Sequence, residues 1–391
     1  MNILFCNYEY PPLGGGGGVV MAALARELAR RHSVTVLTSR ALGLAAEDRD
    51  GGVRVVRAPV FFRKEKAVAN VPSMLAYLPM GALAAGRLRR ERFDVINTHF
   101  AVPTGPLGDW LSRRWAIPNV LSVHGGDLYD PSKRLSPHRI GVLRAPIRRL
   151  LLRADALVGQ SRNTLHNVAQ IYGVRRDSEL IPLGIDRPPQ LERRRAELGL
   201  PEDAFVMATV GRVVARKATP QLVRALKAAD RPRAHLLVVG DGPDAANVRA
   251  EAQGLGIADR VHLLGQVSEE QKYRALAAAD VFVSATQHEG FGLVFLEAMA
   301  YGLPVVCYDH GGQTDFLVEG ETGSVVPLND LERFTRALIT LHDRPDERER
   351  MSRHNRRLIE DYFIDKCAER YETLFLGVVE RAASSRPRAN R

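Results

Sequence analysis

Short apolar runs alternate with longer stretches of helical periodicity along most of the chain. The runs, such as 3–8 and 281–285, are rich in Val, Ile, Leu and Phe, which is typical of strands buried in a parallel sheet. The stretches between the runs, such as 19–31 and 220–229, place their apolar residues on one helical face. This alternation occurs in two blocks without internal repeats, so we expect an α/β fold of two Rossmann-like, doubly wound domains facing a cleft.

The break between the two blocks lies at 183–189. This segment, LGIDRPP, has no periodicity and carries two prolines, a combination that marks a connection between domains. We therefore predict a first domain over 1–186 and a second domain over 187–363. A chain of 391 residues is long enough for two such domains. The polar segment 382–391 is predicted to be a disordered tail.

Four other segments give local predictions. The five glycines at Gly14–Gly18 predict a loop, and the Asp-Arg-Asp segment at 48–50 predicts a solvent-exposed loop without a metal. The stretch 73–92 predicts one long helix that ends in arginines, which favour a helix C-terminus. The stretch 139–153 is rich in Leu and Arg and predicts a surface helix that is broken at Pro146.

The formal net charge of +10 is unevenly distributed. Residues 1–188 hold 27 Lys and Arg against 15 Asp and Glu, a balance of +12, and the rest of the chain balances at −2. A basic first half favours an anionic partner, such as a membrane surface, a lipid phosphate or an acidic polysaccharide. Solvated arginine-rich faces are the alternative. Nucleic acid is disfavoured, because aromatic residues are few and no nucleic-acid-binding motif stands out.

Cysteine usage and hydropathy bear on the compartment. The three cysteines are far apart and form no CxxC or Cys/His pattern, which fits a reducing compartment and disfavours structural zinc. The chain enters its first strand directly, and no apolar run approaches the ~20 residues that a membrane span needs. We therefore expect a cytoplasmic protein, and peripheral contact with the inner face of the membrane stays open.

The strongest chemical signal lies at 281–306. A strand, the turn EGFG and a helix of good formers that stops at Gly302 are followed by another strand, PVVCY. A glycine turn that opens a helix leaves unpaired backbone N–H groups at the positive end of the helix dipole, where an anionic or hydroxyl-rich ligand binds well. Glu297 lies roughly 7–8 Å along the helix axis, so Glu289 and Glu297 are expected to contact different parts of one elongated ligand. The alternative is that Glu289 is only a helix-entry residue and that Glu297 is an ordinary exposed residue of the helix.

Candidate chemistry also occurs at two other strand ends. Arg212 and Lys217 leave a strand and precede a helix, where a guanidinium and an ammonium suit a diphosphate; an exposed basic loop is the alternative. His124 ends a strand before Gly-Gly-Asp, at the edge where open α/β sheets bind ligands; a purely structural histidine is the alternative. The glycine loop suits phosphate too, but strand two ends at Arg40 without the acidic residue that binds an NAD ribose.

These motifs resemble those of the retaining, GT-B-fold glycosyltransferases of family 4 (glycosyl transferases group 1). The segment EGFGLVFLEAMAYGLPVV resembles the E-x7-E signature of the family, and Arg212 with Lys217 matches its G-R-x4-K motif. The chain departs from the family pattern in two places. Ala218 follows the lysine where glycine is common, and Thr314-Asp315 stands where the family's glycine loop usually has Pro-Glu. The resemblance covers nearly the whole chain and is stronger in the second domain.

The resemblance implies transfer of a sugar from a nucleotide-diphosphate donor, with retention and without a metal or another cofactor. It implies that His124 lies beside the transferred sugar, that Glu289 holds the sugar hydroxyls, and that Arg212 and Lys217 stabilise the departing diphosphate. It also implies that a last helix, about 364–381, packs back on an acceptor-binding first domain. The donor-binding residues that it implies are Gly15, Gly16, Arg212, Lys217, Val267 beside the base, Glu289, Gly290, Phe291, Gly292, Leu293 and Glu297 on the ribose.

The sequence leaves the donor and acceptor open. We expect a UDP- or GDP-linked donor and a lipid-linked or cell-surface glycan as acceptor, as in polysaccharide biosynthesis, with a soluble small molecule as the alternative acceptor. A retaining glycosidase also uses two carboxylates, about 5–5.5 Å apart, but needs no cations for a diphosphate. An NAD(P) oxidoreductase lacks its ribose acid, although Arg40 leaves NADP formally open. A non-catalytic sugar-nucleotide-binding protein shares all of these motifs.

Overall fold

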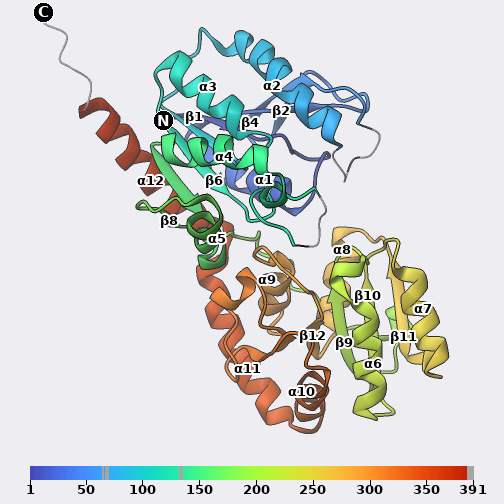
Figure 1. Cartoon of the computed structure of the whole chain (residues 1–391). Helices are drawn as coiled ribbons and strands as arrows, with labels where there is room; N and C mark the ends of the chain where they lie inside the picture. Colours follow the sequence, from blue (N-terminus) through green and yellow to red (C-terminus); the bar gives the residue numbers. More distant parts are fainter. Residues whose placement is uncertain (64–65, 67–69, 132–134, 385–391) are drawn as a thin grey trace, which may run out of the picture. The chain divides into compact units, whose positions relative to one another are not determined.

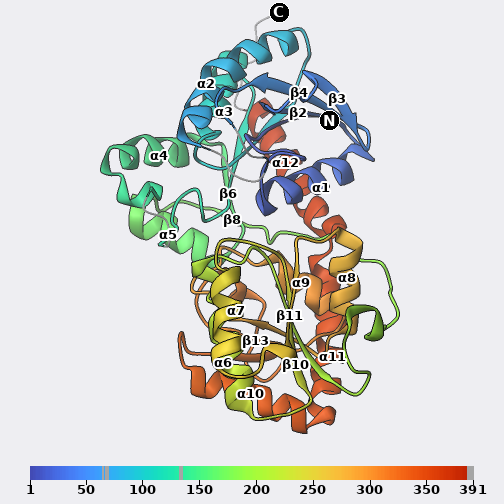
Figure 2. The ribbon, with the colours of Figure 1, turned by 90° about the vertical axis from the view of Figure 1, so that its right-hand side faces the viewer.

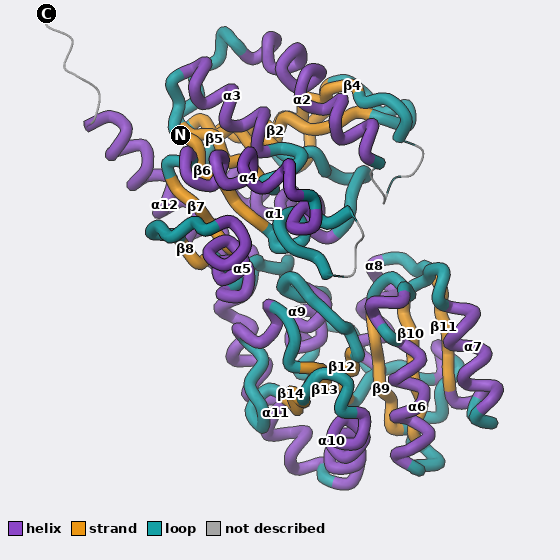
Figure 3. Tube along the Cα trace, viewed as in Figure 1, coloured by secondary structure: helices purple, strands orange, loops and turns teal. Residues whose placement is uncertain are grey.

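The computed structural model describes residues 1–63, 66, 70–131 and 135–384 (Figure 1). The chain divides into two compact units. The first comprises Met1–Asp186 together with the chain from Phe363 onward, and the second comprises Arg187–Tyr362. Each unit is a mostly parallel sheet with helices on both faces (Figure 3). No helix in the described part of the chain is long and apolar enough to cross a membrane.

The sheet of the first unit has the strand order β3-β4-β2-β1-β5-β6-β7-β8. All neighbouring strands run parallel except β3 and β4. The order reverses between β1 and β5, which is where open α/β sheets bind ligands at their carboxyl ends. The strands are β1 (Asn2–Cys6), β2 (Ser33–Arg40), β3 (Glu47–Asp50), β4 (Val53–Pro59), β5 (Val95–His99), β6 (Asn119–Val123), β7 (Ala156–Gly159) and β8 (Glu179–Leu180).

The two faces of this sheet carry different helices, because successive side chains of a strand point to opposite faces. Ile3 and Phe5 pack with α1 and α12, whereas Leu4 and Cys6 pack with α2 and α3, and α4 and α5 extend that second layer (Figure 2). The helices are α1 (Gly16–Ala29), α2 (Val71–Ala85), α3 (Gly105–Trp115), α4 (Gly141–Arg153), α5 (Arg162–Tyr172) and α12 (Ile364–Ser384).

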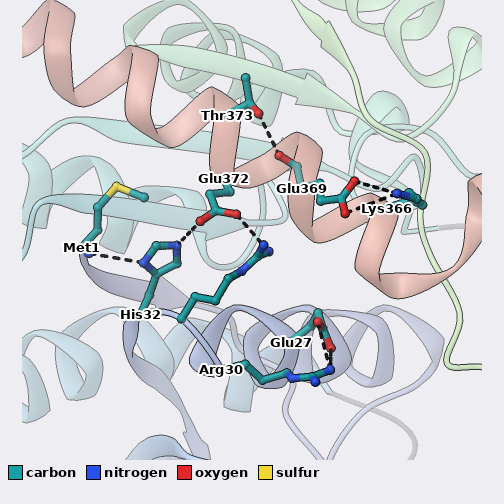
Figure 4. Close-up of polar contacts among 9 residues, drawn as sticks. Met1, Glu27, Arg30, His32, Lys366, Glu369, Glu372 and Thr373 are labelled. Atoms are coloured by element: carbon teal, nitrogen blue, oxygen red, sulfur yellow. Dashed lines mark hydrogen bonds and ion pairs between the residues drawn. The ribbon is translucent and has the colours of Figure 1, made fainter.

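The last helix, α12, is built into the first unit by apolar and charged contacts. Tyr371 and Phe375 are buried in the core that also contains β1, β2 and α1. At the surface, the carboxylate of Glu372 lies 2.7 Å from Nε2 of His32 and 2.9 Å from the guanidinium of Arg31 (Figure 4). The helix continues to Ser384, so the prediction of disorder is wrong for 382–384. The rest of the predicted tail lies outside the described residues.

Two loop predictions for the first unit are wrong. The helix α1 already begins at Gly16, so most of the predicted glycine loop is helical. Packing requires a glycine at one of these positions, because a Cβ on Gly17 would lie 2.4 Å from the ring of Phe100. The Asp-Arg-Asp segment is the edge strand β3, which pairs antiparallel with β4. Asp50 there accepts hydrogen bonds from Tyr10 and Arg26, at 2.7 and 3.1 Å.

Two helix predictions for the first unit are also wrong in extent. The helix α2 ends at Ala85 and gives way to a 3-10 turn, Gly86–Leu88, because Leu88 is buried against the sheet. The helix α4 continues through Pro146. Proline lacks the N–H that would bond the carbonyl of Val142, but Val142 lies in the exposed first turn of α4, where water can satisfy that carbonyl.

The second unit is a sheet of six parallel strands in the order β11-β10-β9-β12-β13-β14. The order reverses between β9 and β12. The helices α6, α7 and α10 pack on one face with β9 and β10, and α8 and α9 lie on the other (Figure 1). The strands are β9 (Phe205–Val210), β10 (Ala234–Val239), β11 (Val261–Gly265), β12 (Val281–Ser284), β13 (Val305–Tyr308) and β14 (Gly323–Val326). The helices are α6 (Thr219–Ala229), α7 (Ala245–Gly254), α8 (Glu269–Ala278), α9 (Leu293–Ala300), α10 (Leu331–Asp343) and α11 (Pro345–Leu358).

Candidate functional site

The candidate residues of the second unit follow β9 and β12, the two neighbouring strands between which the strand order reverses. The segments that leave their carboxyl ends therefore meet. The backbone N–H of Gln287, after β12, donates to the carbonyl of Arg216, after β9, at 2.8 Å. The guanidinium of Arg216 donates in turn to the carbonyl of His288 at 3.1 Å. These bonds fix the two loops against each other.

Lys217 and Glu289 form an ion pair across these loops. The Nζ atom of Lys217 lies 2.6 Å from Oε2 of Glu289, and the two side chains are 16% and 15% exposed. Burial by itself would raise the pKa of the Glu289 carboxyl, but the charges of Lys217 and Arg216 outweigh burial and leave the pKa below its usual value. Glu289 is therefore ionised at neutral pH.

The turn that carries Glu289 is held in shape by two glycines. Gly292 has a φ of 95° and caps the N-terminus of α9, a backbone conformation that favours glycine. Gly311, which follows β13, lies directly against Glu289: a Cβ on Gly311 would stand 2.2 Å from the Glu289 carbonyl oxygen. That carbonyl accepts the N–H of Gly312 at 2.8 Å. The Gly311 loop therefore supports Glu289 through backbone atoms, in spite of the unusual Thr314-Asp315 sequence.

Glu297 lies on α9 and forms a second buried ion pair. Its Oε1 atom lies 2.9 Å from Nζ of Lys272, a residue of α8. Lys272 also contacts Oε2 of Glu269 at 2.6 Å. Burial raises the pKa of Glu297, although Lys272 opposes the shift. The Oε2 atom of Glu297 is buried and has no hydrogen-bond partner within the described residues.

The other predicted donor residues of the second unit follow the strands β9, β11 and β12. Arg212 is exposed directly after β9, and Val267 lies half-buried between β11 and α8. Phe291 is buried and its ring packs on Phe316, with centroids 5.2 Å apart. Gly290 and Leu293 flank the start of α9. The second unit therefore contains two buried ion pairs: Lys217–Glu289 in the loops that follow β9 and β12, and Lys272–Glu297 between α8 and α9.

In the first unit, His124 follows β6 and is 8% exposed. Its Nε2 atom lies 2.8 Å from Nδ1 of His99, which ends the neighbouring strand β5. The amide nitrogen of Asn97 lies 3.0 Å from Nε2 of His99. An amide nitrogen can only donate, so Nε2 of His99 accepts and Nδ1 of His99 carries the proton. His99 therefore donates to His124, which must hold its own proton on Nδ1.

A longer chain of hydrogen bonds supports this arrangement. Tyr371 of α12 donates to Ser122 at 3.0 Å, and Ser122 donates to the amide oxygen of Asn97 at 3.0 Å. Burial lowers the pKa of His124 to about 4, so its imidazole is neutral at pH 7. The Nδ1 atom of His124 has no hydrogen-bond partner in the described part of the chain. His124 is thus a neutral ring whose buried Nδ1–H makes no hydrogen bond to the described residues.

Gly15 and Gly16 lie at the N-terminus of α1, in the first unit with His124. The N–H of Gly15 is already used, because it donates to the carboxylate of Glu9 at 3.1 Å.

Asp127, three residues after His124, accepts hydrogen bonds from the backbone N–H groups of Ala101 and His124 at 2.6 and 2.9 Å. Asp127 therefore ties the ends of β5 and β6 together and orients the backbone of His124.

Sequence reasoning missed Lys272 and His99. Lys272 occupies a buried position of α8 together with Ala275 and Leu276, so a charged residue on the apolar face of a helix was the available signal. His99 ends β5 and His124 directly follows β6, and the two strands pair in the sheet. Among the residues that the structure describes, no group of three or more His, Cys, Asp and Glu side chains is arranged to hold a metal ion.

Comparisons with known proteins agree with these motifs. Residues 14–187 match the family model Glycosyltransferase Family 4, and residues 191–358 match Glycosyl transferases group 1. The chain is 30% identical to a GDP-mannose-dependent alpha-(1-6)-phosphatidylinositol monomannoside mannosyltransferase of Mycolicibacterium smegmatis, over 86% of this chain and 88% of the relative. It is 32% identical to a 2-deoxystreptamine N-acetyl-D-glucosaminyltransferase of Streptomyces fradiae, over 83% of this chain and 81% of the relative.

Among solved structures, the chain resembles the sucrose-phosphate synthase of Thermosynechococcus elongatus. The TM-score is 0.82 and the sequence identity is 22%, over 97% of this chain and 100% of that chain. This likeness concerns the fold.

Proposed function

The chain belongs to the GT-B glycosyltransferases of group 1 and family 4, and from this premise we propose that it transfers a sugar, with retention, from a UDP- or GDP-linked donor bound by the second unit. The observation that carries the proposal is the buried Lys217–Glu289 pair. It sets a cation suited to a diphosphate beside a carboxylate suited to sugar hydroxyls, where open α/β sheets bind ligands.

Lys217 and Arg212 are proposed to stabilise the leaving diphosphate. Negative charge grows on the diphosphate oxygen as its bond to the anomeric carbon breaks, and a preorganised cation lowers the energy of that state. Lys217 need not release Glu289 to do so, because an ammonium has three N–H donors. Arg212 is exposed after β9, so its guanidinium can reach the ligand without breaking a buried contact.

Glu289 and the start of α9 are proposed to hold the sugar. An ionised carboxylate accepts hydrogen bonds from sugar hydroxyls, and the N–H groups of Gly290, Phe291 and Gly292 lie at the positive end of α9. The acceptor hydroxyl forms the new bond to the anomeric carbon and passes its proton to the departing phosphate oxygen. No protein nucleophile and no metal take part in this scheme, as the family resemblance implies.

Glu297 is proposed to bind the ribose through its unpaired oxygen, and the loop at Val267 to lie against the base. His124 remains the candidate of the first unit for contact with the transferred sugar. Its Nδ1–H is a donor that the fold leaves unused, and its neutral ring adds no charge to the reaction. In this proposal the first unit binds the acceptor.

For the acceptor, we propose a lipid-linked or cell-surface glycan. The relative from Mycolicibacterium smegmatis, whose name includes a phosphatidylinositol mannoside, supports this proposal. A soluble small-molecule acceptor is the second candidate, and the relative named for 2-deoxystreptamine supports it. The surface of the first unit favours the lipid-linked class.

That surface centres on α2, which has no charged residue along its whole length. Leu75 and Leu83 of α2 are 72% and 70% exposed, and arginines follow the helix directly, at Arg87, Arg89 and Arg90. A groove of about 790 Å³ lies between α2, α3 and α4, with Trp110 at its wall and Arg113 and Arg149 at its rim. Exposed apolar side chains beside arginines suit the interface of an anionic bilayer, so we propose peripheral contact there.

The donor proposal is tested by incubating the protein with UDP- and GDP-sugars and candidate acceptors, and by determining the anomeric configuration of the product by NMR. Retained configuration with wild type, and loss of turnover in Glu289→Gln and Lys217→Met, are expected. An inverted product contradicts the proposed mechanism. A product that forms only on a soluble acceptor contradicts the lipid-linked proposal.

The membrane proposal is tested by flotation with phosphatidylglycerol and with phosphatidylcholine vesicles. Wild type is expected to float with the anionic vesicles and to be released by salt. The double variant Leu75→Asp/Leu83→Asp is expected to stay behind, whereas the control Leu376→Asp, an exposed leucine on α12, should float. Equal behaviour of the two variants contradicts the assignment of this surface.

A further inference from the structure

Lys272 is a buried lysine in a second unit whose other charged side chains are mostly at the surface. It is 9% exposed and lies on the side of α8 that also buries Ala275 and Leu276. Its ammonium contacts Oε1 of Glu297 at 2.9 Å and Oε2 of Glu269 at 2.6 Å, and it stands 4.4 Å from the ring centroid of Tyr273. Removing an ammonium from water is costly unless charged partners compensate. The two carboxylates therefore fix the position of the Lys272 ammonium.

The two carboxylates that contact Lys272 are not equivalent. The side chain of Glu269 is 78% exposed, so solvent satisfies it whether or not the lysine is present. The side chain of Glu297 is 14% exposed, and Oε2 has no hydrogen-bond partner in the described structure. A buried acceptor that is left unsatisfied is unfavourable in a native fold. The unpaired Oε2 atom lies at the proposed site for the sugar donor, which indicates that a hydroxyl of the bound ligand donates a hydrogen bond to it.

We propose that Lys272 is a positioning residue, which holds the Glu297 carboxylate by one oxygen and so presents the other oxygen to the ribose hydroxyls of the donor nucleotide. This inference rests on the proposed function, in which Glu297 binds the ribose. It adds a residue that the E-x7-E motif does not contain. Lys272 itself need not touch the nucleotide.

The consequence of losing Lys272 follows from the burial of Glu297. Without the ammonium, the carboxylate is a buried charge whose remaining neighbours include Glu269 and Tyr273, and neither of them is a cation. It can take up a proton or rotate towards water, and either change removes the acceptor from the ribose. The ribose is remote from the reacting carbon, so this loss weakens the ground state and the transition state equally. The effect therefore falls on donor binding and KM, with kcat at saturating donor retained.

The experiment is a calorimetric titration of UDP and GDP, each with its 2′-deoxy form, into wild type and variants. We expect Lys272→Met to raise the dissociation constant of the preferred ribonucleotide about tenfold or more, the loss of one hydrogen bond to a charged group. We expect the same variant to lose discrimination between the ribo and 2′-deoxy forms. Lys272→Arg should restore part of the affinity, because it keeps the charge. Lys227→Met removes an exposed lysine of α6 and should match wild type.

A second comparison separates failure of this inference from failure of the proposed function. Glu297→Gln should weaken nucleotide binding and abolish the ribose preference; unchanged binding in that variant overturns the donor site itself, and this inference with it. If Glu297→Gln weakens binding while Lys272→Met binds like wild type, only the role of Lys272 is refuted.

The double variant Lys272→Met/Glu297→Gln provides a readout even if Lys272→Met alone fails to fold, because it buries no unpaired charge. It should bind like Glu297→Gln, since Lys272 acts through Glu297. Additive losses in the double variant overturn the proposal. Donor turnover by the same variants should show raised KM with kcat within about twofold of wild type, and a lowered kcat at saturating donor also refutes it.

Discussion

Replacing Lys217 with methionine should destabilise the second unit, because it leaves Glu289 as a buried carboxylate without its nearest cation. The two groups are 2.6 Å apart, and each side chain is about 15% exposed. At an effective dielectric constant of about 20, unit charges separated by ~4 Å attract each other by about 4 kcal/mol. Removing one partner of a buried pair costs a similar amount, about 3–5 kcal/mol.

Arg216 remains beside Glu289 in this variant and compensates part of the loss, so we expect Lys217→Met to lower the free energy of unfolding by about 3 kcal/mol. Glu289→Gln should cost less, about 1 kcal/mol, because the amide oxygen still accepts a hydrogen bond from Lys217. The double variant Lys217→Met/Glu289→Gln contains no unpaired charge and should lose little more than Glu289→Gln does. The coupling energy of the cycle is therefore about 2–3 kcal/mol.

The assay is urea unfolding followed by two probes. Both tryptophans, Trp110 and Trp115, belong to the first unit, so tryptophan fluorescence reports that unit and far-UV circular dichroism reports both. The dichroism transition should shift in Lys217→Met while the fluorescence transition stays in place. Strictly additive losses in the cycle would refute the ion-pair argument, and so would a Lys217→Met variant as stable as wild type.

Three further predictions use other features of the structure. First, the pKa of His124 is about 4 in the folded protein and about 6.5 in the unfolded chain, so its contribution to stability is complete above pH ~6.5 and is lost as the pH falls towards 4. The loss amounts to about 3 kcal/mol for this group, and His124→Phe should reduce the acid dependence of the urea midpoint measured by tryptophan fluorescence; an unchanged dependence would contradict the neutral, buried imidazole. Second, the pKa of Glu289 is lowered by its cations, so its contribution is present above the unfolded pKa of about 4.3 and disappears as the pH falls below it. Glu289→Gln should flatten the dichroism-monitored stability of the second unit in that window, and equal slopes for the two proteins would show that the pair does not titrate as described. Third, Gly311→Ala places a Cβ 2.2 Å from the carbonyl oxygen of Glu289 and should lower stability by about 2 kcal/mol or more together with nucleotide affinity, whereas Gly254→Ala, where nothing lies within 4 Å, should do neither in the same melting and titration experiments.

The sequence predicted the strand, turn and helix at 281–300 well, because the signals for these elements are local. The expected strand at 281–285 is β12, Val281–Ser284, and the helix expected to start near Gly292 is α9, which begins at Leu293. An apolar run, a glycine turn and a proline stop are all read within a few residues of each other. The sequence also placed Lys217 in a basic loop after a strand, but its contact with Glu289 became visible only with the strand order of the structure.

The features that the sequence did not predict depend on contacts between distant residues. The run Gly14–Gly18 has the composition of a loop, but Gly17 lies in α1, and the distant ring of Phe100 occupies the space that a Cβ at this position would need. The pairing of Lys272 with Glu297 joins residues of two helices. The apolar face of α8 marks Lys272 as unusual, but no local pattern identifies Glu297 as its partner. The relay from Tyr371 to His124 likewise needs α12 to be packed in the first unit.

The most direct test of the central claim is calorimetric titration of UDP, GDP and ADP, and of their sugars, into wild type, Lys217→Ala and Glu297→Ala. Lys217 pairs with Glu289, whereas Glu297 pairs with Lys272, so the two substitutions disturb different ion pairs. If both substitutions weaken the binding of one ligand, that ligand lies between the two residues. We predict that wild type binds one nucleotide clearly more tightly than the others and that both substitutions weaken this binding. If no nucleotide binds, or if binding is unchanged in both variants, the donor site is not where the carboxyl ends of β9 and β12 place it.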